Sequence, residues 1–386
     1  MRTPAAITGV GLVIAEPADR SSATDLALRA VHAACDDAGI TISDVDGLLL
    51  NHNELIADDK LTLDIARQGG FGELSVLYEL NAKGTTFSVL LDQAQQAVDA
   101  GSATSVVVLF ADAAQQHGVG SGAAFAAMGG ARGQRGLERA GGMLGAVAAY
   151  AFLAAHYFQT TGASARDLMA IAIAQRSWAA GNPLARARTP LTETEYLDSP
   201  LVAEPLRRLD CARPVNGAAA VIVTSGRSGS SAPVRITGSA HRSMERRRHA
   251  PVSPWEPVGA SEAFSSALDR AGRSRDDLDL LQIYDPFTVV PLILLEAFGF
   301  AEPGTAGEFV RDGGAGIGGS MPTNTGGGQV SAYYLQGVTP VFEAVTQLRG
   351  QGGDRQVSDA SLAAVSAIGG RLEHHSTIVL EREDAS

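Results

Sequence analysis

The stretch PAAITG, residues 4–9, returns later in the chain as PVRITG, residues 233–238. A second motif repeats in the same way: Ala-Gly and then Asp-Val-Asp within residues 38–46 return as Ala-Gly and then Asp-Leu-Asp within residues 271–279. Internal repeats of this kind determine the architecture of a chain before any single element does. We therefore predict two copies of one structural unit.

Each copy shows the same alternation of strands and helices. An opening strand precedes an amphipathic helix and a buried strand; an Asn and a Gly/Thr-rich turn then lead to a second helix and another apolar strand. The expected elements are helices at 26–38 and 260–271, strands at 47–50 and 280–284, second helices that end near Ala100 and Arg349, and strands at 105–110 and 363–368. This alternation is typical of parallel or mixed sheets covered by helices, so the fold class is layered α/β.

The repeat also predicts the domain organisation. An N-terminal half, residues 1–228, meets a C-terminal half, residues 229–386, at a Gly/Ser-rich linker. The first half carries a long insertion, residues 112–208, before its closing strand. Long excursions from a compact α/β fold are usually lids or subunit contacts, so we expect substrate to bind near this insertion.

Composition and charge narrow the function classes. With 386 residues, of which 45% are hydrophobic and 19% charged, the chain can bury a large core. A formal net charge of −12 argues against nucleic acid or an anionic membrane surface as the main partner. The longest apolar stretches are shorter than the roughly 20 residues that span a bilayer. The two cysteines, Cys35 and Cys211, make no disulfide framework, and we expect a soluble, cytoplasmic protein.

Several motifs together resemble one enzyme superfamily. They are Leu209-Asp210-Cys211 followed by Asn216-Gly217-Ala218-Ala219-Ala220, Tyr284-Asp285-Pro286-Phe287 at a strand end, and the turn Asn324-Thr325-Gly326-Gly327-Gly328. With the paired halves, they resemble the thiolase superfamily, specifically its sterol-carrier-protein-type branch, over nearly the whole chain. The resemblance implies the thiolase fold: two pseudo-symmetric βαβαβαββ halves in five layers, α-β-α-β-α.

The four positions that carry catalysis in that branch are all changed here. The nucleophilic cysteine at a helix start falls on or next to Gly84, in the stretch Asn81-Ala82-Lys83-Gly84-Thr85-Thr86. The two histidines fall on Tyr284 and Tyr334, and the second cysteine falls on Ala367. Thiols have become small residues and imidazoles have become phenols.

This pattern removes covalent acyl transfer, because an acyl-enzyme needs a thiolate. It leaves a site that can stabilise an acyl-CoA enolate, the intermediate of aldol and retro-aldol chemistry. A similar replacement by Tyr characterises the steroid side-chain aldolases, thiolase-like proteins long labelled lipid-transfer proteins. What this resemblance implies is retro-aldol cleavage of a β-hydroxyacyl-CoA of a steroid side chain to a ketone and a short acyl-CoA. Pro286, where Cys or Ser is common, leaves the substrate itself open.

The predicted catalytic residues are Tyr284, Tyr334 and Asp285. The phenols would transfer protons, and a neighbouring Asp, a second Tyr or a helix N-terminus can tune their pKa. Tyr333 is the alternative to Tyr334, since only one of two adjacent strand residues can face the site, and Asp285 could instead be a structural acceptor. The residues predicted to bind the CoA thioester are Gly84, Asn324, Gly327, Gly328, Gly369 and Gly370.

Cofactors and partners follow from the same resemblance. No metal is expected, since His374 and His375 lack companion ligands at metal-binding spacing, and no cofactor beyond the CoA thioester that serves as substrate. The resemblance implies a homodimer in complex with a small partner that has an OB-fold and a zinc ribbon.

Three alternatives remain open. Lys83 could form a Schiff base with a carbonyl substrate. The chain could be a non-catalytic subunit that binds acyl-CoA or scaffolds an enzyme. It could also be a divergent acyltransferase that uses Cys35 or Cys211, although neither lies at a turn-to-helix start.

Overall fold

The computed structural model describes residues 4–16, 18–52, 61–115, 133–225, 232–243, 257–370 and 372–383. The predicted boundary between residues 228 and 229 lies outside these ranges, as does part of the Gly/Ala-rich start of the insertion. The division into two domains at that point therefore stays a prediction.

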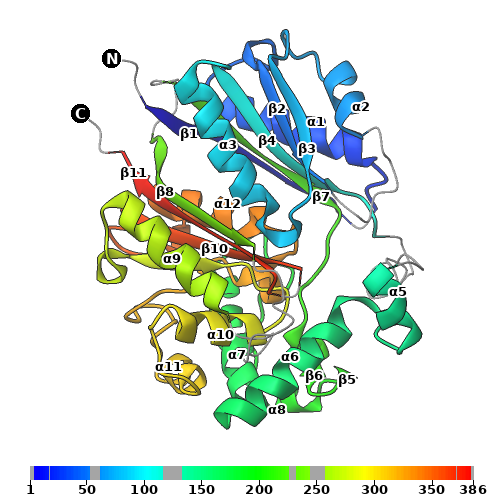
Figure 1. Ribbon diagram of the computed structural model, residues 1–386, viewed down its shortest axis with the longest axis vertical. Coiled ribbons are helices and arrows are strands. Elements are labelled where there is room, and N and C mark those ends of the chain that lie inside the picture. The colour runs from blue at the N-terminus through cyan, green and yellow to red at the C-terminus, as the bar shows by residue number, and fades with distance from the viewer. Residues whose placement is uncertain are drawn as a thin grey trace.

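The two halves share the same order of elements except at the third strand (Figure 1). The first half contains β1 (Ala5–Ile14), α1 (Ala23–Ala38), β2 (Gly47–Asn51), α2 (Leu61–Gln68), β3 (Val76–Leu80), α3 (Thr86–Ala100), β4 (Ser105–Asp112) and β7 (Gly217–Ser225). The second half contains β8 (Val234–Ser243), α9 (Val258–Ala271), β9 (Leu280–Ile283), α10 (Val289–Ala297), α11 (Ala306–Arg311), α12 (Val338–Leu348), β10 (Leu362–Gly369) and β11 (His374–Arg382). The elements expected from the repeat are present, with bounds that differ by a few residues.

Local sequence explains the ends of the paired helices. Helix α1 begins with a capping box, in which Ser22 and Asp25 satisfy each other's backbone N–H groups. It ends at Gly39, and α9 ends at Gly272, each with a left-handed backbone of φ 67° and 65°. Glycine adopts this conformation without a steric cost, so both copies stop their first helix with the same residue.

The strands form one hydrogen-bonded sheet in the order β3-β2-β4-β7-β1-β8-β11-β10-β9. In both halves the first strand is antiparallel to the last, and another pair of neighbouring strands, β2 with β4 and β9 with β10, is parallel. The halves meet between β1 and β8, where Ile7 lies opposite Val234. The repeat found in the sequence therefore places its own first strands side by side at the centre of the sheet.

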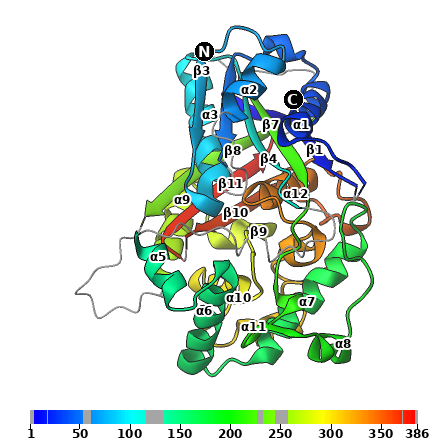
Figure 2. The ribbon, with the colours of Figure 1, turned by 90° about the vertical axis from the view of Figure 1, so that its right-hand side faces the viewer.

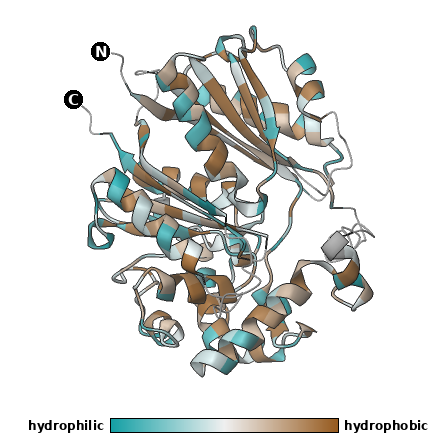
Figure 3. Cartoon of the chain, viewed as in Figure 1, coloured by the Kyte–Doolittle hydropathy of each residue, from teal (hydrophilic) through white to brown (hydrophobic). Residues whose placement is uncertain are grey.

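Three hydrophobic cores hold five layers together, since the middle core lies on both sides of the central helix layer. The predicted α-β-α-β-α thiolase fold is confirmed. One core lies between α1 and the outer face of the first half of the sheet, and another lies between α9 and α10 and the outer face of the second half. The middle core packs α3 and α12 between the two halves of the sheet (Figure 2). Hydrophobic residues accordingly concentrate on the strands of both halves (Figure 3).

One element of the repeat differs between the halves. Strand β3 pairs with β2 along five residues, but in the second half only Thr323 forms a bridge, to Leu281 of β9. The segment before it is rich in glycine, with Gly313 and Gly318 at positive φ, and Pro322 has no N–H to donate. The third strand of the second half is thus reduced to a single bridge.

The insertion of the first half packs against the second half. It forms α5 (Gly133–Ala140), α6 (Gly145–Thr161), α7 (Ala165–Ala180), α8 (Glu193–Asp198) and the small hairpin of β5 (Leu201–Ala203) and β6 (Leu206–Arg207). Apolar residues of α6 and α7 share a core with α9, α10 and α11. Along the described ranges, no helix combines the length and the apolar character that crossing a bilayer requires.

Candidate active site

Two phenols meet at the boundary between β9 and the glycine-rich turn. Tyr284 directly follows β9, and Tyr334 follows the turn and a short π-helix, Gly328–Ala332. Their hydroxyl oxygens lie 3.1 Å apart, and their rings are tilted by 52° with centroids 6.2 Å apart. Both side chains are buried, with 6% and 9% of their surface exposed. The two residues predicted to carry proton transfer therefore form one hydrogen-bonded pair.

The structure also separates Tyr334 from its neighbour. Tyr333 has an extended backbone, so the two adjacent side chains point to opposite sides. Tyr333 joins the middle core between the sheet halves, whereas Tyr334 joins the outer core that contains Tyr284. Tyr334 is thus the member of the pair that reaches the other phenol.

Burial raises the pKa of both phenols. The pKa of Tyr334 rises to about 12, since the hydrogen bond from Tyr284 offsets only part of the desolvation cost. The pKa of Tyr284 is also raised well above its ordinary value, because of burial first and then of the nearby Tyr334 and Tyr150. The neighbouring groups do not lower the pKa of either phenol to near 7. Both phenols are therefore protonated at pH 7 and can donate hydrogen bonds.

A tight turn, Ala82–Thr86, carries Gly84 to the start of α3; we call it the first elbow. Lys83 has a left-handed backbone, with φ 59°, and the Thr86 hydroxyl accepts a hydrogen bond from Ala82 N–H at 2.8 Å. A β-carbon on Gly84 would lie 2.2 Å from the Ile368 carbonyl oxygen and 2.7 Å from Cε1 of Tyr284. The space beside Gly84, the predicted position of the lost nucleophile, is therefore closed by the Ile368 carbonyl and by the ring of Tyr284 from the other half.

The second half contains a matching turn, Leu335–Thr339, which we call the second elbow. Gln336 is left-handed with φ 51°, Gly337 follows it, and the Thr339 hydroxyl accepts from Leu335 N–H at 3.1 Å. A β-carbon on Gly337 would lie 2.3 Å from the carbonyl oxygen of Gly84, so the two elbows touch through their glycines. The two elbows therefore correspond in structure, although their sequences have in common only the glycine at the third position and the threonine at the fifth.

Asp285 is fully buried and holds the turn rather than a phenol. Its carboxylate accepts hydrogen bonds from Gln329 N–H at 2.9 and 3.1 Å and from the Gln175 amide at 2.8 Å. Desolvation raises the pKa of Asp285 to about 7, although these donors oppose the shift. Because the Gln329 N–H lies in the π-helix before Tyr334, these contacts give Asp285 a positioning role, and its catalytic role stays a prediction.

The glycine-rich turn is built by close approach of backbone and side chains. Gly327 and Gly328 have positive φ; a β-carbon on Gly327 would lie 2.5 Å from Cβ of Ala179 in α7, and one on Gly328 would lie 2.3 Å from Oδ2 of Asp285. Asn324 accepts from Ile283 N–H at 2.7 Å and lines a small interior cavity with Tyr333. These contacts give the three predicted thioester-binding residues a structural role in the turn.

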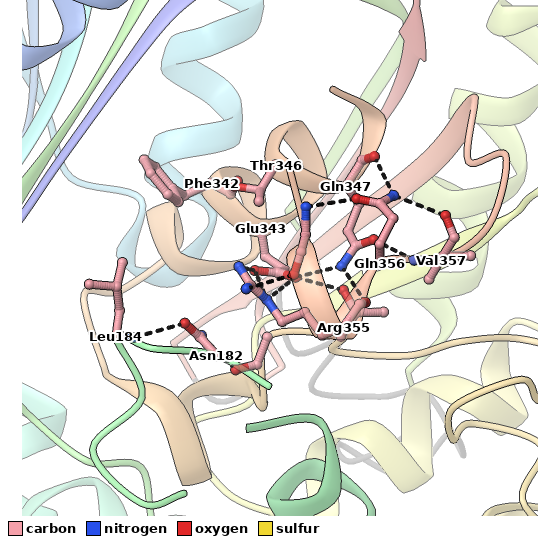
Figure 4. Close-up of polar contacts among 12 residues, drawn as sticks. Asn182, Leu184, Phe342, Glu343, Thr346, Gln347, Arg355, Gln356 and Val357 are labelled. Carbon is pink, nitrogen blue, oxygen red and sulfur yellow. Dashed lines mark hydrogen bonds and ion pairs between the residues drawn. The ribbon is translucent and has the colours of Figure 1, made fainter. Parts of the chain in front are cut away.

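A buried ion pair lies next to the glycine-rich turn and is bonded to it (Figure 4). Arg355 and Glu343 are joined at 3.0 Å, and Glu343 also accepts from the Gln347 amide and the Thr325 hydroxyl, each at 2.9 Å. The buried carboxylate of Glu343 is thus paired with a cation and also accepts hydrogen bonds from two neutral donors, which offsets the cost of burying its charge. The network anchors α12 to the glycine-rich turn through Thr325.

Gly369 and Gly370 lie at the end of β10, next to the first elbow. A β-carbon on Gly369 would lie 2.5 Å from the carbonyl oxygen of Ala82, and Gly370 has φ 67°. The carbonyl of Gly370 accepts a hydrogen bond, at 3.5 Å, from the hydroxyl of Tyr150 in α6. Ala367, the position of the second thiol, is buried in the same core as both phenols.

Two residues of the insertion belong to this site and were missed from the sequence. Tyr150 stacks on Phe287 with ring centroids 4.6 Å apart, and its proximity contributes to the raised pKa of Tyr284. Gln175 reaches Asp285 from α7. The repeat could not reveal them, because the insertion has no counterpart in the second half.

The remaining candidates lie in different surroundings. Burial raises the pKa of Cys35, inside α1, to about 11 and that of Cys211 to about 12, so neither is a thiolate at neutral pH. His375 is buried and burial lowers its pKa to about 4, whereas His374 bonds to Ser243 at the surface. Within the described residues, no group of three or more His, Cys, Asp or Glu side chains is placed to hold a metal ion.

Comparison with known proteins places these features in a family. The family model for a thiolase C-terminal domain-like region matches residues 213–382. A 17-hydroxy-3-oxo-4-pregnene-20-carboxyl-CoA lyase from Mycobacterium tuberculosis is 32% identical over 359 residues, 90% of this chain and 92% of the relative. A steroid side-chain-cleaving aldolase from Thermomonospora curvata is 32% identical over 367 residues, 90% of each chain.

A solved structure agrees over the whole chain. The Ltp2-ChsH2(DUF35) aldolase superposes with a TM-score of 0.86 at 29% identity, and the match covers 100% of this chain and 99% of the other. The level of identity to the two aldolases over most of their length is enough to define the family. This chain belongs to the thiolase superfamily, in the sterol-carrier-protein-type branch that includes the steroid side-chain-cleaving aldolases.

Proposed function

We propose that this protein is a carbon–carbon lyase whose substrate is a β-hydroxyacyl-CoA formed by a steroid side chain. It cleaves this substrate into a ketone and a shortened acyl-CoA. The observation that carries the proposal is the buried hydrogen bond between Tyr284 and Tyr334, which lies against Gly84, where the resemblance places the thiolase nucleophile. The lyase and aldolase activities of the 32% identical relatives support the same reaction.

The paired phenols allow retro-aldol cleavage without a stable phenolate. As the Cα–Cβ bond breaks, the electron pair of the β-hydroxyl O–H bond forms the ketone, and the bonding pair of Cα–Cβ becomes the thioester enolate. One phenol oxygen accepts the hydroxyl proton while passing its own proton across the 3.1 Å hydrogen bond, and the second phenol gives its proton to Cα. Both tyrosines end with a proton, which suits groups whose pKa values are raised by burial.

The surroundings of the pair suit an enolate. Helix α3 begins at Thr86, two residues after Gly84, and a helix N-terminus favours negative charge nearby. The phenols themselves lie in a core of aliphatic and aromatic side chains, where hydrogen bonds to a developing oxyanion are strong. No cofactor takes part in the proposed steps beyond the CoA thioester of the substrate.

Product analysis by mass spectrometry tests the reaction. The purified protein is incubated with a 17-hydroxysteroid carboxyl-CoA thioester, alone and with a DUF35 partner, and ketone and shortened acyl-CoA are quantified. We expect both products in equal amounts, and their loss in a Tyr334→Phe variant. Intact substrate in both incubations would favour the alternative of a non-catalytic acyl-CoA-binding subunit. Borohydride trapping with the ketone separately tests a Schiff base at Lys83.

We also propose a complex in which two copies of this chain pair and each binds a DUF35-type partner with an OB-fold and a zinc ribbon, in the cytoplasm. The aldolase of the similar structure is described together with a DUF35 protein. For the pairing of two copies, the support is β3: it is an edge strand, with Leu77 and Tyr78 exposed, and Leu63 of α2 is exposed nearby in the sequence. An open apolar edge is a template for strand pairing.

Light scattering tests the pairing of copies. We expect a dimer mass for the unmodified chain and a monomer mass for Tyr78→Lys, since a lysine at an edge strand opposes pairing. A monomer mass for both the unmodified chain and the Tyr78→Lys variant would contradict the dimer.

A further inference from the structure

We infer that Gly84 is a positioning residue that selects phenol chemistry in this site, because the space that a side chain at residue 84 needs is the space that the ring of Tyr284 occupies. The inference rests on the proposed function in one respect, the role of Tyr284 in proton transfer. Its structural content is independent of any substrate.

Two walls close the space next to Gly84. A β-carbon there would lie 2.2 Å from the Ile368 carbonyl oxygen, 2.7 Å from Cε1 of Tyr284 and 2.9 Å from Cζ of the same ring. Non-bonded carbon atoms are most stable at about 3.5–4.0 Å. A side chain at residue 84 must therefore displace the strand end or the phenol.

The strand end is the more firmly held of the two walls. Ile368 belongs to β10, where it pairs with His375 of β11, and the neighbouring carbonyl of Ser366 accepts from Tyr284 N–H at 2.9 Å. The side chain of Tyr284 can rotate, and its hydroxyl is held by the 3.1 Å bond to Tyr334. A substitution at Gly84 must therefore shift the Ile368 carbonyl by some distance in every case, and it also displaces the ring of Tyr284, which is the wall that can rotate away.

The second elbow shows that this arrangement is specific to residue 84. A β-carbon on Gly337 would meet the Gly84 carbonyl oxygen at 2.3 Å and Cβ of Phe87 at 3.5 Å, and its three nearest atoms include no phenol. At the place on β2 that corresponds to Tyr284, Asn51 donates to the Gln336 side chain at 3.1 Å. Close backbone approach demands glycine at both elbows, but only at Gly84 does an aromatic ring share the space.

The site therefore cannot hold a side chain at residue 84 together with the ring of Tyr284 in its present place. A nucleophile cannot be restored by changing Gly84 alone, because its thiol would compete with the ring of Tyr284. Loss of the nucleophile and gain of the phenol are two parts of one steric exchange.

A thermal-unfolding cycle tests this exchange. Gly84→Ala is measured alone and combined with Tyr284→Leu, which removes the ring atoms Cε1 and Cζ. We expect Gly84→Ala alone to lower the Tm by roughly 3–8 °C, as overpacking does. In the combined variant the effect should be smaller but not zero, because the contact with the Ile368 carbonyl remains. Gly337→Ala is the matched control, and its effect should be the same with and without Tyr284→Leu.

An equal effect of Gly84→Ala in the two backgrounds would overturn the inference. Should Gly84→Ala alone not fold, the inference requires that the double variant folds; an unfolded double variant also overturns it. In the lyase assay we expect Gly84→Ala to lower kcat by about tenfold or more with a nearly unchanged KM, since the phenol pair moves and the rest of the site does not. The unfolding cycle uses no substrate, so the inference and the lyase assignment can fail separately.

Discussion

The two elbows have the same backbone and face different side chains. Each places a left-handed residue before a glycine, Lys83 and Gly84 in one and Gln336 and Gly337 in the other. Tyr284 reaches the first elbow from the end of β9, whereas Asn51, at the end of β2, bonds to the second elbow. The comparison shows that the duplicated backbone supplies the scaffold twice, while the chemistry depends on the single side chain that crosses from the other half.

The largest expected effect separates the adjacent tyrosines that follow the glycine-rich turn. We expect Tyr334→Phe to lower kcat by about 10²- to 10⁴-fold, because it removes one hydroxyl of the proton relay. Tyr333→Phe is the matched control: it is as deeply buried but lies in the other core, so we expect kcat within about threefold. Steady-state kinetics on both variants measures the difference, and equal losses would contradict the placement of the site.

The next effect concerns the link between the strand end and the turn. Asp285→Ala leaves the Gln329 N–H and the Gln175 amide without their acceptor, and we expect a loss of about 2–3 kcal/mol in the free energy of unfolding. Denaturant unfolding measures it. A variant as stable as the unmodified chain would show that the turn does not depend on this carboxylate.

The same carboxylate predicts a pH dependence. The folded-state pKa of Asp285 is about 7, above its ordinary value of 3.8, so the folded state keeps a proton that the unfolded state releases. Its contribution to stability is therefore lost as the pH rises from about 4 to about 7. We expect stability, relative to Asp285→Asn, to fall across this window. A flat difference between the two proteins would show that Asp285 is ionised throughout.

The smallest effect belongs to the second elbow. Asn51→Ala removes a hydrogen bond to Gln336 but no group that we place in the reaction. We expect a loss of about 1 kcal/mol in stability and kcat within about threefold. A loss of activity as large as that of Tyr334→Phe would mean that both elbows take part in catalysis.

The repeat in the sequence predicted most of the fold. The paired helices and strands and the layered architecture follow from motifs such as residues 4–9 and 233–238, because each copy keeps the same buried pattern. The reduced third strand of the second half was not predicted, since glycine and proline near Thr323 interrupt pairing there without changing the elements around it.

The site could be predicted only in part. Tyr284 and Tyr334 were found because they replace residues of known position, but their 3.1 Å hydrogen bond depends on how the turn folds back. Gly327, Gly328 and Asn324 have structural contacts within the turn, and their predicted role in binding the thioester stays a prediction. Tyr150 and Gln175 could not be found, since their contacts to the second half are set by tertiary packing alone.

The packing of the insertion against the second half has a consequence for synthesis. Helices α6 and α7 are translated before α9, α10 and α11, the helices that cover their apolar faces. The emerging chain therefore exposes these faces until more than half of its length has left the ribosome, a state that is prone to aggregation. We expect the nascent chain to depend on chaperones during this interval, and a separately expressed first half to be insoluble.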